Sequence, residues 1–173
     1  MTLPNNQPVA LEDSDKAPLQ MITFTLGDEI YGVDIMAVRE IRVWSDTTSL
    51  PNSPEFVLGV INLRGVIVPV FDLRDRFGSG PTTPTKTHAV IIVAVDTRTI
   101  GILVDSVSDI IDLKNADVRP VPEMEFRQDS AYLVGLATAN DQMISIISTD
   151  KLFHKQVVQI ATESSEQLEA IPA

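Results

Sequence analysis

The hydrophobic pattern consists of short apolar segments separated by turns. Segments that combine β-branched and aromatic residues read as strands when turn residues bound them, and the clearest of them are Met21–Leu26, Ile30–Ile35, Arg42–Trp44 and Val66–Phe71. Before residue 148, none of the long segments shows apolar residues repeated with a helical period. The pattern therefore predicts an all-β fold of short, regularly spaced strands, typical of barrels and sandwiches.

The stretch from Leu58 to Phe77, LGVINLRGVIVPVFDLRDRF, holds the most distinctive of these strands. Its run VIVPVF has Pro69 in the middle, and a proline cannot donate a hydrogen bond to a neighbouring strand. We therefore expect this strand at a sheet edge or at a bulge. Ahead of it, Arg64 and Gly65 are typical of a tight hairpin turn that presents Arg64 at its tip.

The second half of the chain repeats the first. FTLGDEIYGVDIMAVREI, from Phe24, aligns without a gap with VAVDTRTIGILVDSVSDI, from Val93, at an offset of sixty-nine residues. Gly32 then falls on Gly101. After an insertion, Gly59 falls on Gly135, and IVPVF is matched by MISII. One register shared by many apolar positions indicates two copies of one strand-rich unit.

We expect one domain over residues 19–160, with polar segments before it, within it and after it. Residues 1–18 are polar and proline-containing and predict a disordered tail, whereas 78–87 has the Gly, Pro and Thr content of a linker. A short C-terminal helix is expected from Asp150 to Ile160, capped by Ser148 or Thr149. Residues 161–173 predict a flexible acidic tail.

Composition narrows the possible partners. The net charge is −11, from 13 Lys and Arg against 24 Asp and Glu, which disfavours nucleic-acid binding. Cysteine is absent, so disulfides and thiolate chemistry are excluded. The N-terminus has no signal-peptide pattern, and the longest wholly apolar run, Ala89–Val95, is too short to span a bilayer. We therefore expect a cytoplasmic protein.

The sequence offers little catalytic chemistry. The two histidines, His88 and His154, are predicted to be surface or packing residues. The pairs Asp72/Asp75 and Asp109/Asp112 could bind a divalent cation or share a proton, but solvated strand ends are the simpler interpretation. No nucleophile elbow, phosphate-binding loop or metal motif is present. We expect no enzyme, cofactor or metal; a β-barrel that carries a small ligand remains the alternative.

Charged residues beside apolar ones suggest a protein interface instead. Glu40 lies between Val38 and Ile41, and Arg64 is expected at its hairpin tip. Interface centres combine apolar patches with arginine anchors and few other charges. The alternative is that Val38 and Ile41 belong to the core and Glu40 is simply solvated.

Several motifs, in their order along the chain, resemble those of the CheW-type chemotaxis coupling proteins. The motifs are FTLGDEIYGVDIMAVREIR, VLGVINLRGVIVPVFDLRDRF, VGILVDSVSDII and LVGLATANDQMISIISTDKL. The resemblance implies two intertwined five-stranded SH3-like β-barrels that share a core. It also implies a non-enzymatic adaptor that joins the cytoplasmic hairpin tips of chemoreceptors to the CheA histidine kinase. Kinase and adaptor would associate barrel to barrel, in rings near the membrane.

In such proteins the groove between the barrels takes the receptor hairpin. The positions of this sequence that match are Ile35, Val38, Glu40, Ile41, Arg64 and Gly65, with Val107 and Ile110 as candidates from the second copy. The kinase-binding residues are not assigned by the resemblance.

Overall fold

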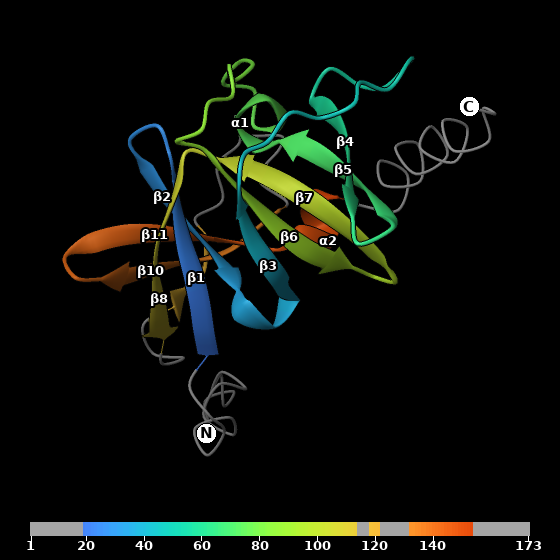
Figure 1. Cartoon of the computed structure of the whole chain (residues 1–173). Coiled ribbons are helices and arrows are strands. Elements are labelled where there is room, and N and C mark those ends of the chain that lie inside the picture. The colour runs from blue at the N-terminus through green and yellow to red at the C-terminus, as the bar shows by residue number, and fades with distance from the viewer. Residues whose placement is uncertain (1–18, 114–117, 122–131, 154–173) are drawn as a thin grey trace, which may run out of the picture.

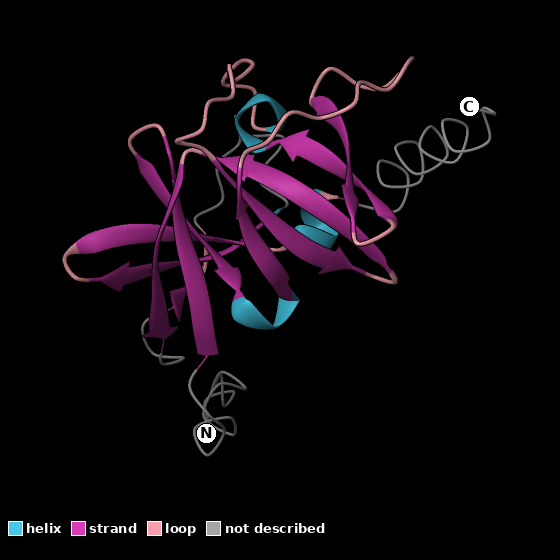
Figure 2. Ribbon diagram, in the orientation of Figure 1, coloured by secondary structure: helices cyan, strands magenta, loops and turns pink. Residues whose placement is uncertain are grey.

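The computed structural model describes residues 19–113, 118–121 and 132–153. Within these ranges strands are the main regular structure and the helices are only single turns (Figure 2), which confirms the all-β prediction. The predicted tails, His154 and the helix beyond Phe153 lie outside the described residues. The elements are β1 (Leu19–Leu26), β2 (Glu29–Asp34), η2 (Ile35–Ala37), β3 (Val38–Val43), β4 (Val57–Leu63), β5 (Val66–Asp72), α1 (Leu73–Arg76), β6 (Ala89–Val95), β7 (Arg98–Val104), β8 (Ser106–Leu113), β9 (Val118–Arg119), β10 (Leu133–Ala139), β11 (Gln142–Ile147) and α2 (Thr149–Leu152).

The strands form two sheets, and each sheet makes one barrel (Figure 1). Barrel A has the order β8-β1-β2-β11-β10-β9, and barrel B has the order β3-β6-β7-β5-β4. Strands from both sequence copies contribute to each barrel. In barrel A, β1 and β2 of the first copy pair with β8 and β11 of the second, whereas in barrel B, β6 and β7 pair with β3 and β5. The two copies are therefore intertwined.

In each barrel, a short parallel ladder joins a strand of one copy to a strand of the other, and each ladder contains a glycine. Gly32 of β2 lies opposite Ile146 of β11, and its repeat counterpart Gly101 of β7 lies opposite Val70 of β5. A Cβ added at Gly101 would lie 2.9 Å from Val90 Cγ1, and one at Gly32 would lie 3.2 Å from Ile144 Cγ2. The two glycines thus leave room for side chains of neighbouring strands.

Three apolar clusters follow from the exchange. The shared core, the largest, draws on both barrels and includes Phe24, Phe71, Ile91, Ile102 and Phe153, all fully buried. The other two are small. The barrel B core is built around Val68, Val70, Val90, Ile92 and Leu103. The barrel A core is built around Met21, Leu113, Ala137 and Ile146.

Pro69 is not at a sheet edge, so that prediction was wrong. β5 lies between β4 and β7, and the bulge in its ladder with β4 is elsewhere, between Val57 and Gly59. Val60, opposite Pro69, exchanges both of its backbone hydrogen bonds with Thr48. The nitrogen of Pro69 therefore faces β7, and the ladder with β7 begins only at Val70. The missing donor is tolerated because no partner strand requires it.

The single helical turns α1 and α2 occupy equivalent places in the two copies. Asp72 and Ser148 precede them, and each side chain accepts a hydrogen bond from the backbone N–H three residues later. Asp72 is almost fully buried and also accepts hydrogen bonds from Thr82, at 2.6 Å from its N–H and 2.8 Å from its hydroxyl. The predicted linker 78–87 is therefore tied to the fold at Thr82.

Glu55 and Phe56 form a turn that leads directly into β4. Beyond it, Gly59 has a φ of +136°, and a Cβ there would lie 2.3 Å from the carbonyl oxygen of Thr48. Thr48 forms the bridge with Val60 that continues barrel B past β4. Only glycine fits this position without moving that bridge.

We expect residues 19–77 not to fold when expressed alone. This fragment retains the β1–β2 and β4–β5 pairs but loses the partners β6, β7, β8 and β11, together with their share of the core. Two hairpins without a common core are marginal in water. The fragment should show little dispersion of its amide signals in NMR spectra. A soluble, well-dispersed fragment would contradict the shared-core architecture.

We expect Gly59→Ala to destabilise the protein by about 3 kcal/mol or more, because backbone strain adds to a steric clash. This corresponds to a fall in Tm of roughly 6–12 °C. Gly80→Ala is the matched control, since Gly80 also has a positive φ, +90°, but no atom within 4 Å of an added Cβ. Equal shifts in the two variants would mean that strain alone, without the contact to Thr48, sets the cost.

Candidate functional site

Five of the predicted residues lie on the shared-core side of η2, β3 and β8, and we call them the interbarrel surface: Ile35, Val38, Ile41, Val107 and Ile110. Ile35 belongs to η2, which packs against both β1 of barrel A and β6 of barrel B. Val38 and Ile41 lie on β3, the edge strand of barrel B, and Val107 and Ile110 on β8, the edge strand of barrel A. The structure therefore brings residues of both copies to the junction of the two barrels.

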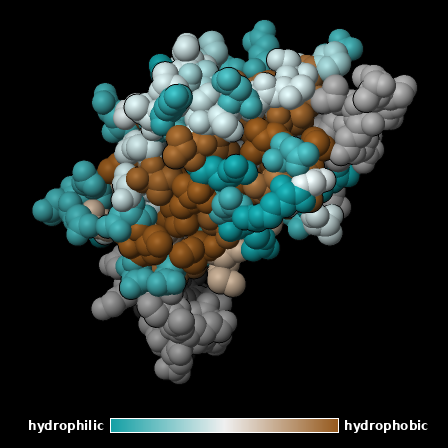
Figure 3. Space-filling model, in the orientation of Figure 1, coloured by the Kyte–Doolittle hydropathy of each residue, from teal (hydrophilic) through white to brown (hydrophobic). Residues whose placement is uncertain are grey.

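The interbarrel surface continues the shared core outward. Ile35, Val38 and Val107 are half-buried and pack against the shared core. Ile41 and Ile110 are 43% and 54% exposed. Apolar side chains gather over β1 and the space between β1 and β3, with polar side chains on the β3 side (Figure 3). The alternative that Val38 and Ile41 belong to the core therefore fits Val38, which packs against the shared core, but not Ile41, which is exposed.

A β-bulge in each copy sets which residues face outward. In β3, Val38 lies opposite Val93 of β6, but Glu40 already lies opposite Ile92, so Arg39 is the extra residue. In β8, Ser108 is the extra residue between Val107 and Asp109. The bulge places Val38 on the shared-core side and Glu40 on the barrel B side, although only Arg39 stands between them. Without it, both would lie on the same face.

Glu40, Arg64 and Gly65 therefore form a separate group, across β3 from Ile41. Arg64 and Gly65 make the turn between β4 and β5 with φ values of +53° and +86°, which confirms the predicted hairpin tip. The Gly65 N–H donates to Asn62 Oδ1 over 2.8 Å. Arg64 Nη2 lies 3.2 Å from Glu40 Oε2, and Arg42 Nε lies 3.9 Å from Glu40 Oε1. The carboxylate thus links the hairpin tip to β3.

The sequence interpretation missed two exposed apolar residues beside the interbarrel surface. Met36 of η2 is 77% exposed, and Val43 of β3 is 66% exposed. Val43 lies on the same face as Ile41, so the period of two along β3 could have found it. Met36 lies in a 3-10 turn, which no strand period reveals.

The predicted carboxylate pairs have different surroundings. Asp72 is buried and hydrogen-bonded, so the solvated interpretation was wrong for it, whereas Asp109 and Asp112 are exposed. Desolvation, followed by the nearby charges of Asp72 and Glu55, raises the pKa of Asp75. Among the described residues no group of three or more His, Cys, Asp or Glu side chains could hold a metal ion.

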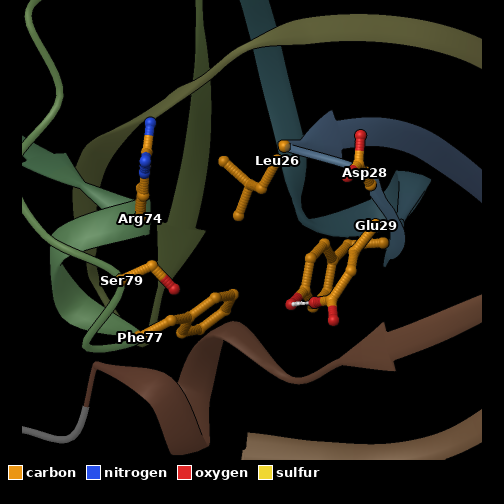
Figure 4. A pocket seen from close by; sticks show the side chains of 8 residues that line it. Leu26, Asp28, Glu29, Arg74, Phe77 and Ser79 are labelled. Carbon is orange, nitrogen blue, oxygen red and sulfur yellow. Dashed lines mark hydrogen bonds between the residues drawn. The ribbon is translucent and has the colours of Figure 1, made fainter.

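A crevice of about 320 Å³ bears on the ligand-carrier alternative (Figure 4). It lies between the β1–β2 turn and the end of α1. Its lining includes Leu26, Tyr31 and Phe77, but also the exposed side chains of Asp28, Glu29 and Arg74. Tyr31 donates a hydrogen bond to Glu29 across its wall. A carrier requires an enclosed apolar cavity, and this open, charged crevice gives no support to that function.

Two joined barrels with an exposed apolar surface between them define a protein-binding scaffold. Comparisons with known proteins agree with this class. The CheW-like domain family matches residues 20–157. The chain is 38% identical over 144 residues to the probable chemotaxis protein CheW of Rhizobium etli, covering 83% of this chain and 93% of that protein. It is 39% identical to the chemotaxis protein CheW of Rhizobium meliloti, covering 78% and 86%.

A solved structure supports the same conclusion. The scaffolding protein TtCheW from Thermoanaerobacter tengcongensis has a TM-score of 0.74 and 37% identity, covering 81% of this chain and 95% of that one. This chain therefore belongs to the CheW-like family. It has the predicted fold of two intertwined SH3-like barrels and the function of a chemotaxis scaffold. Where the structure describes the chain, none of its helices has the length and apolar character to cross a membrane.

We expect the Glu40–Arg64 ion pair to contribute little to stability. Arg64 is 78% exposed, and exposed ion pairs contribute about 0–1 kcal/mol. Glu40→Gln and Arg64→Asn should each change Tm by less than about 2–4 °C, and asparagine before glycine suits the turn. Phe71→Ala, in the shared core, is the control and should cost about 3–5 kcal/mol. Comparable losses in all three variants would assign the ion pair to the fold.

Proposed function

We propose that this protein is a non-enzymatic adaptor that couples the cytoplasmic tips of chemoreceptors to the CheA histidine kinase. The supporting observation is the interbarrel surface, where two edge strands present exposed apolar side chains at the junction of the barrels. Contiguous exposed apolar side chains typically mark a binding site for another protein. The family's role in chemotaxis supports the choice of partners.

The receptor hairpin would bind with its apolar side chains against Ile41 and Ile110. An amphipathic helix in such a position gains affinity from the apolar area that both partners remove from water. These contacts would rest on the half-buried side chains of Val38, Val107 and Ile35, which pack against the shared core. Glu40, Arg64 and Gly65 would form a second contact region, on the barrel B side of β3.

The kinase would bind elsewhere on the barrels, through its regulatory domain of the same fold. This leaves the interbarrel surface free for the receptor, so both partners can be held at once. The protein would remain on the cytoplasmic side and be recruited to membrane-associated receptor arrays. Barrel-to-barrel contacts would also permit weak self-association within those arrays.

We expect Ile41→Ser and Arg64→Ala each to lower the affinity for a chemoreceptor hairpin fragment more than tenfold. The first removes an apolar contact, and the second removes an anchor whose partner charge would remain unpaired. Titration calorimetry with the receptor fragment measures this loss. Binding of the CheA kinase, measured in parallel, should stay unchanged.

Val134→Ser is the matched control, because Val134 is 45% exposed but lies near the start of β10, at the other end of that strand from the β10–β11 turn and separated from β8 by β1, β2 and β11. It should leave receptor affinity unchanged. Tm of every variant should stay near that of the parent protein. If Ile41→Ser and Val134→Ser bind the receptor fragment equally well, the interbarrel surface is not the receptor site.

A further inference from the structure

The interbarrel surface is built twice from the same pattern. Val38 and Ile41 of β3 are repeat counterparts of Val107 and Ile110 of β8. Both pairs follow the same bulge geometry at the edge of a barrel. Both also lie on the face of the sheet that covers the shared core. The apolar part of the surface is therefore close to two-fold symmetric.

A symmetric apolar surface cannot by itself orient a helical hairpin. An antiparallel pair of helices has a similar outline after half a turn about its long axis. Apolar contacts are non-directional, so either helix could lie along β3. An adaptor that holds receptor and kinase in fixed geometry requires one orientation. Specificity of this kind depends on a difference in free energy between the two arrangements.

The charged residues on the other face of the two edge strands and in the adjoining hairpin turns are not symmetric. On barrel B they are Arg39, Glu40, Arg42 and Arg64, and the carboxylate of Glu40 is already shared between two of these arginines. Arg39 is exposed and donates a hydrogen bond to the carbonyl oxygen of Met36, over 3.3 Å. The barrel B side is therefore net positive, in a protein with a net charge of −11.

The equivalent places on barrel A are net negative. Asp109 corresponds to Glu40, but Ser108 and Ile111 replace Arg39 and Arg42, and Asp112 replaces Val43. The hairpin turn also differs: Asn140 and Asp141 occupy the places of Arg64 and Gly65.

The backbone of the two turns is nevertheless alike. Arg64 and Asn140 both have φ of +53°, and Gly65 and Asp141 have +86° and +61°. The side chains change while the backbone stays the same.

We propose that this charge difference selects one of the two orientations of the bound receptor hairpin. The helix that carries acidic side chains near the tip lies along β3 and Arg64, and the helix that carries basic side chains lies along β8. The inference rests on the proposed function, since it assumes that the interbarrel surface is the receptor site. Charges at the rim of an interface act in this way, because they penalise the wrong arrangement by like-charge contact.

The test exchanges the two turns and reads the orientation by cross-linking. The exchanged protein carries Arg64→Asn, Gly65→Asp, Asn140→Arg and Asp141→Gly, which keeps composition and net charge and suits both backbones. Ser108→Cys on β8 supplies a single thiol, since the chain has no cysteine. The probe is a chemoreceptor hairpin fragment with one cysteine near its tip, on either the first or the second helix.

In the parent background, Ser108→Cys should form a disulfide with one helix at least about fivefold more than with the other. The turn exchange should reduce this preference severalfold or reverse it. High salt should weaken the preference in both proteins, because it screens exposed charges.

The same preference in parent and exchanged protein would overturn the charge-selection inference while leaving the receptor site intact. So would equal cross-linking to both helices in the parent. Cross-linking to neither helix, together with unchanged receptor affinity of Ile41→Ser, would overturn the proposed function and this inference together. Tm of the exchanged protein verifies that it is folded.

Discussion

The exchange of strands between the two sequence copies is the constraint on which the rest of the structure depends. It passes through the short parallel ladders at Gly32 and Gly101, where side chains of adjacent strands leave little room for a Cβ atom. Because β2 ends in one barrel and β5 in the other, the largest apolar cluster belongs to neither copy alone. The junction between the barrels is thus filled by buried apolar side chains, and the binding surface rests on this core.

The bulges at Arg39 and Ser108 let one strand serve two regions. On β3, Val38 and Ile41 follow the shared core, while Glu40 and Arg42 turn to the hairpin tip of barrel B. An ideal strand with strict alternation would have put Val38 and Glu40 on one face. The apolar and the charged parts of the candidate site are therefore adjacent in sequence but lie on different faces of β3.

Much of this could be predicted from the sequence because it depends on local or repeated patterns. The register shared by the two halves predicted two copies. Arg64 before Gly65 predicted a turn, and the backbone of that turn is confirmed by the structure. The prediction from Pro69 was wrong because the sequence does not show where the ladder between β5 and β7 begins, so it does not show that no partner strand requires the missing N–H. The bulges and the buried hydrogen bonds of Asp72 depend on partners far along the chain, such as Ile92 of β6 and Thr82. No local period reports such partners.

The long reach of the strand pairs also sets the order in which the protein can fold during synthesis. Thr23 of β1 exchanges hydrogen bonds with Asp109 of β8, 86 residues later. β1 therefore leaves the ribosome well before its neighbour exists, and so does β2, whose neighbour β11 lies near the end of the described chain. Contacts between residues so distant in sequence slow folding, and unpaired strand edges invite association with other chains. The first copy is therefore most prone to aggregate during synthesis, before β6 to β11 emerge from the ribosome. Chaperones that bind nascent chains would act at this point.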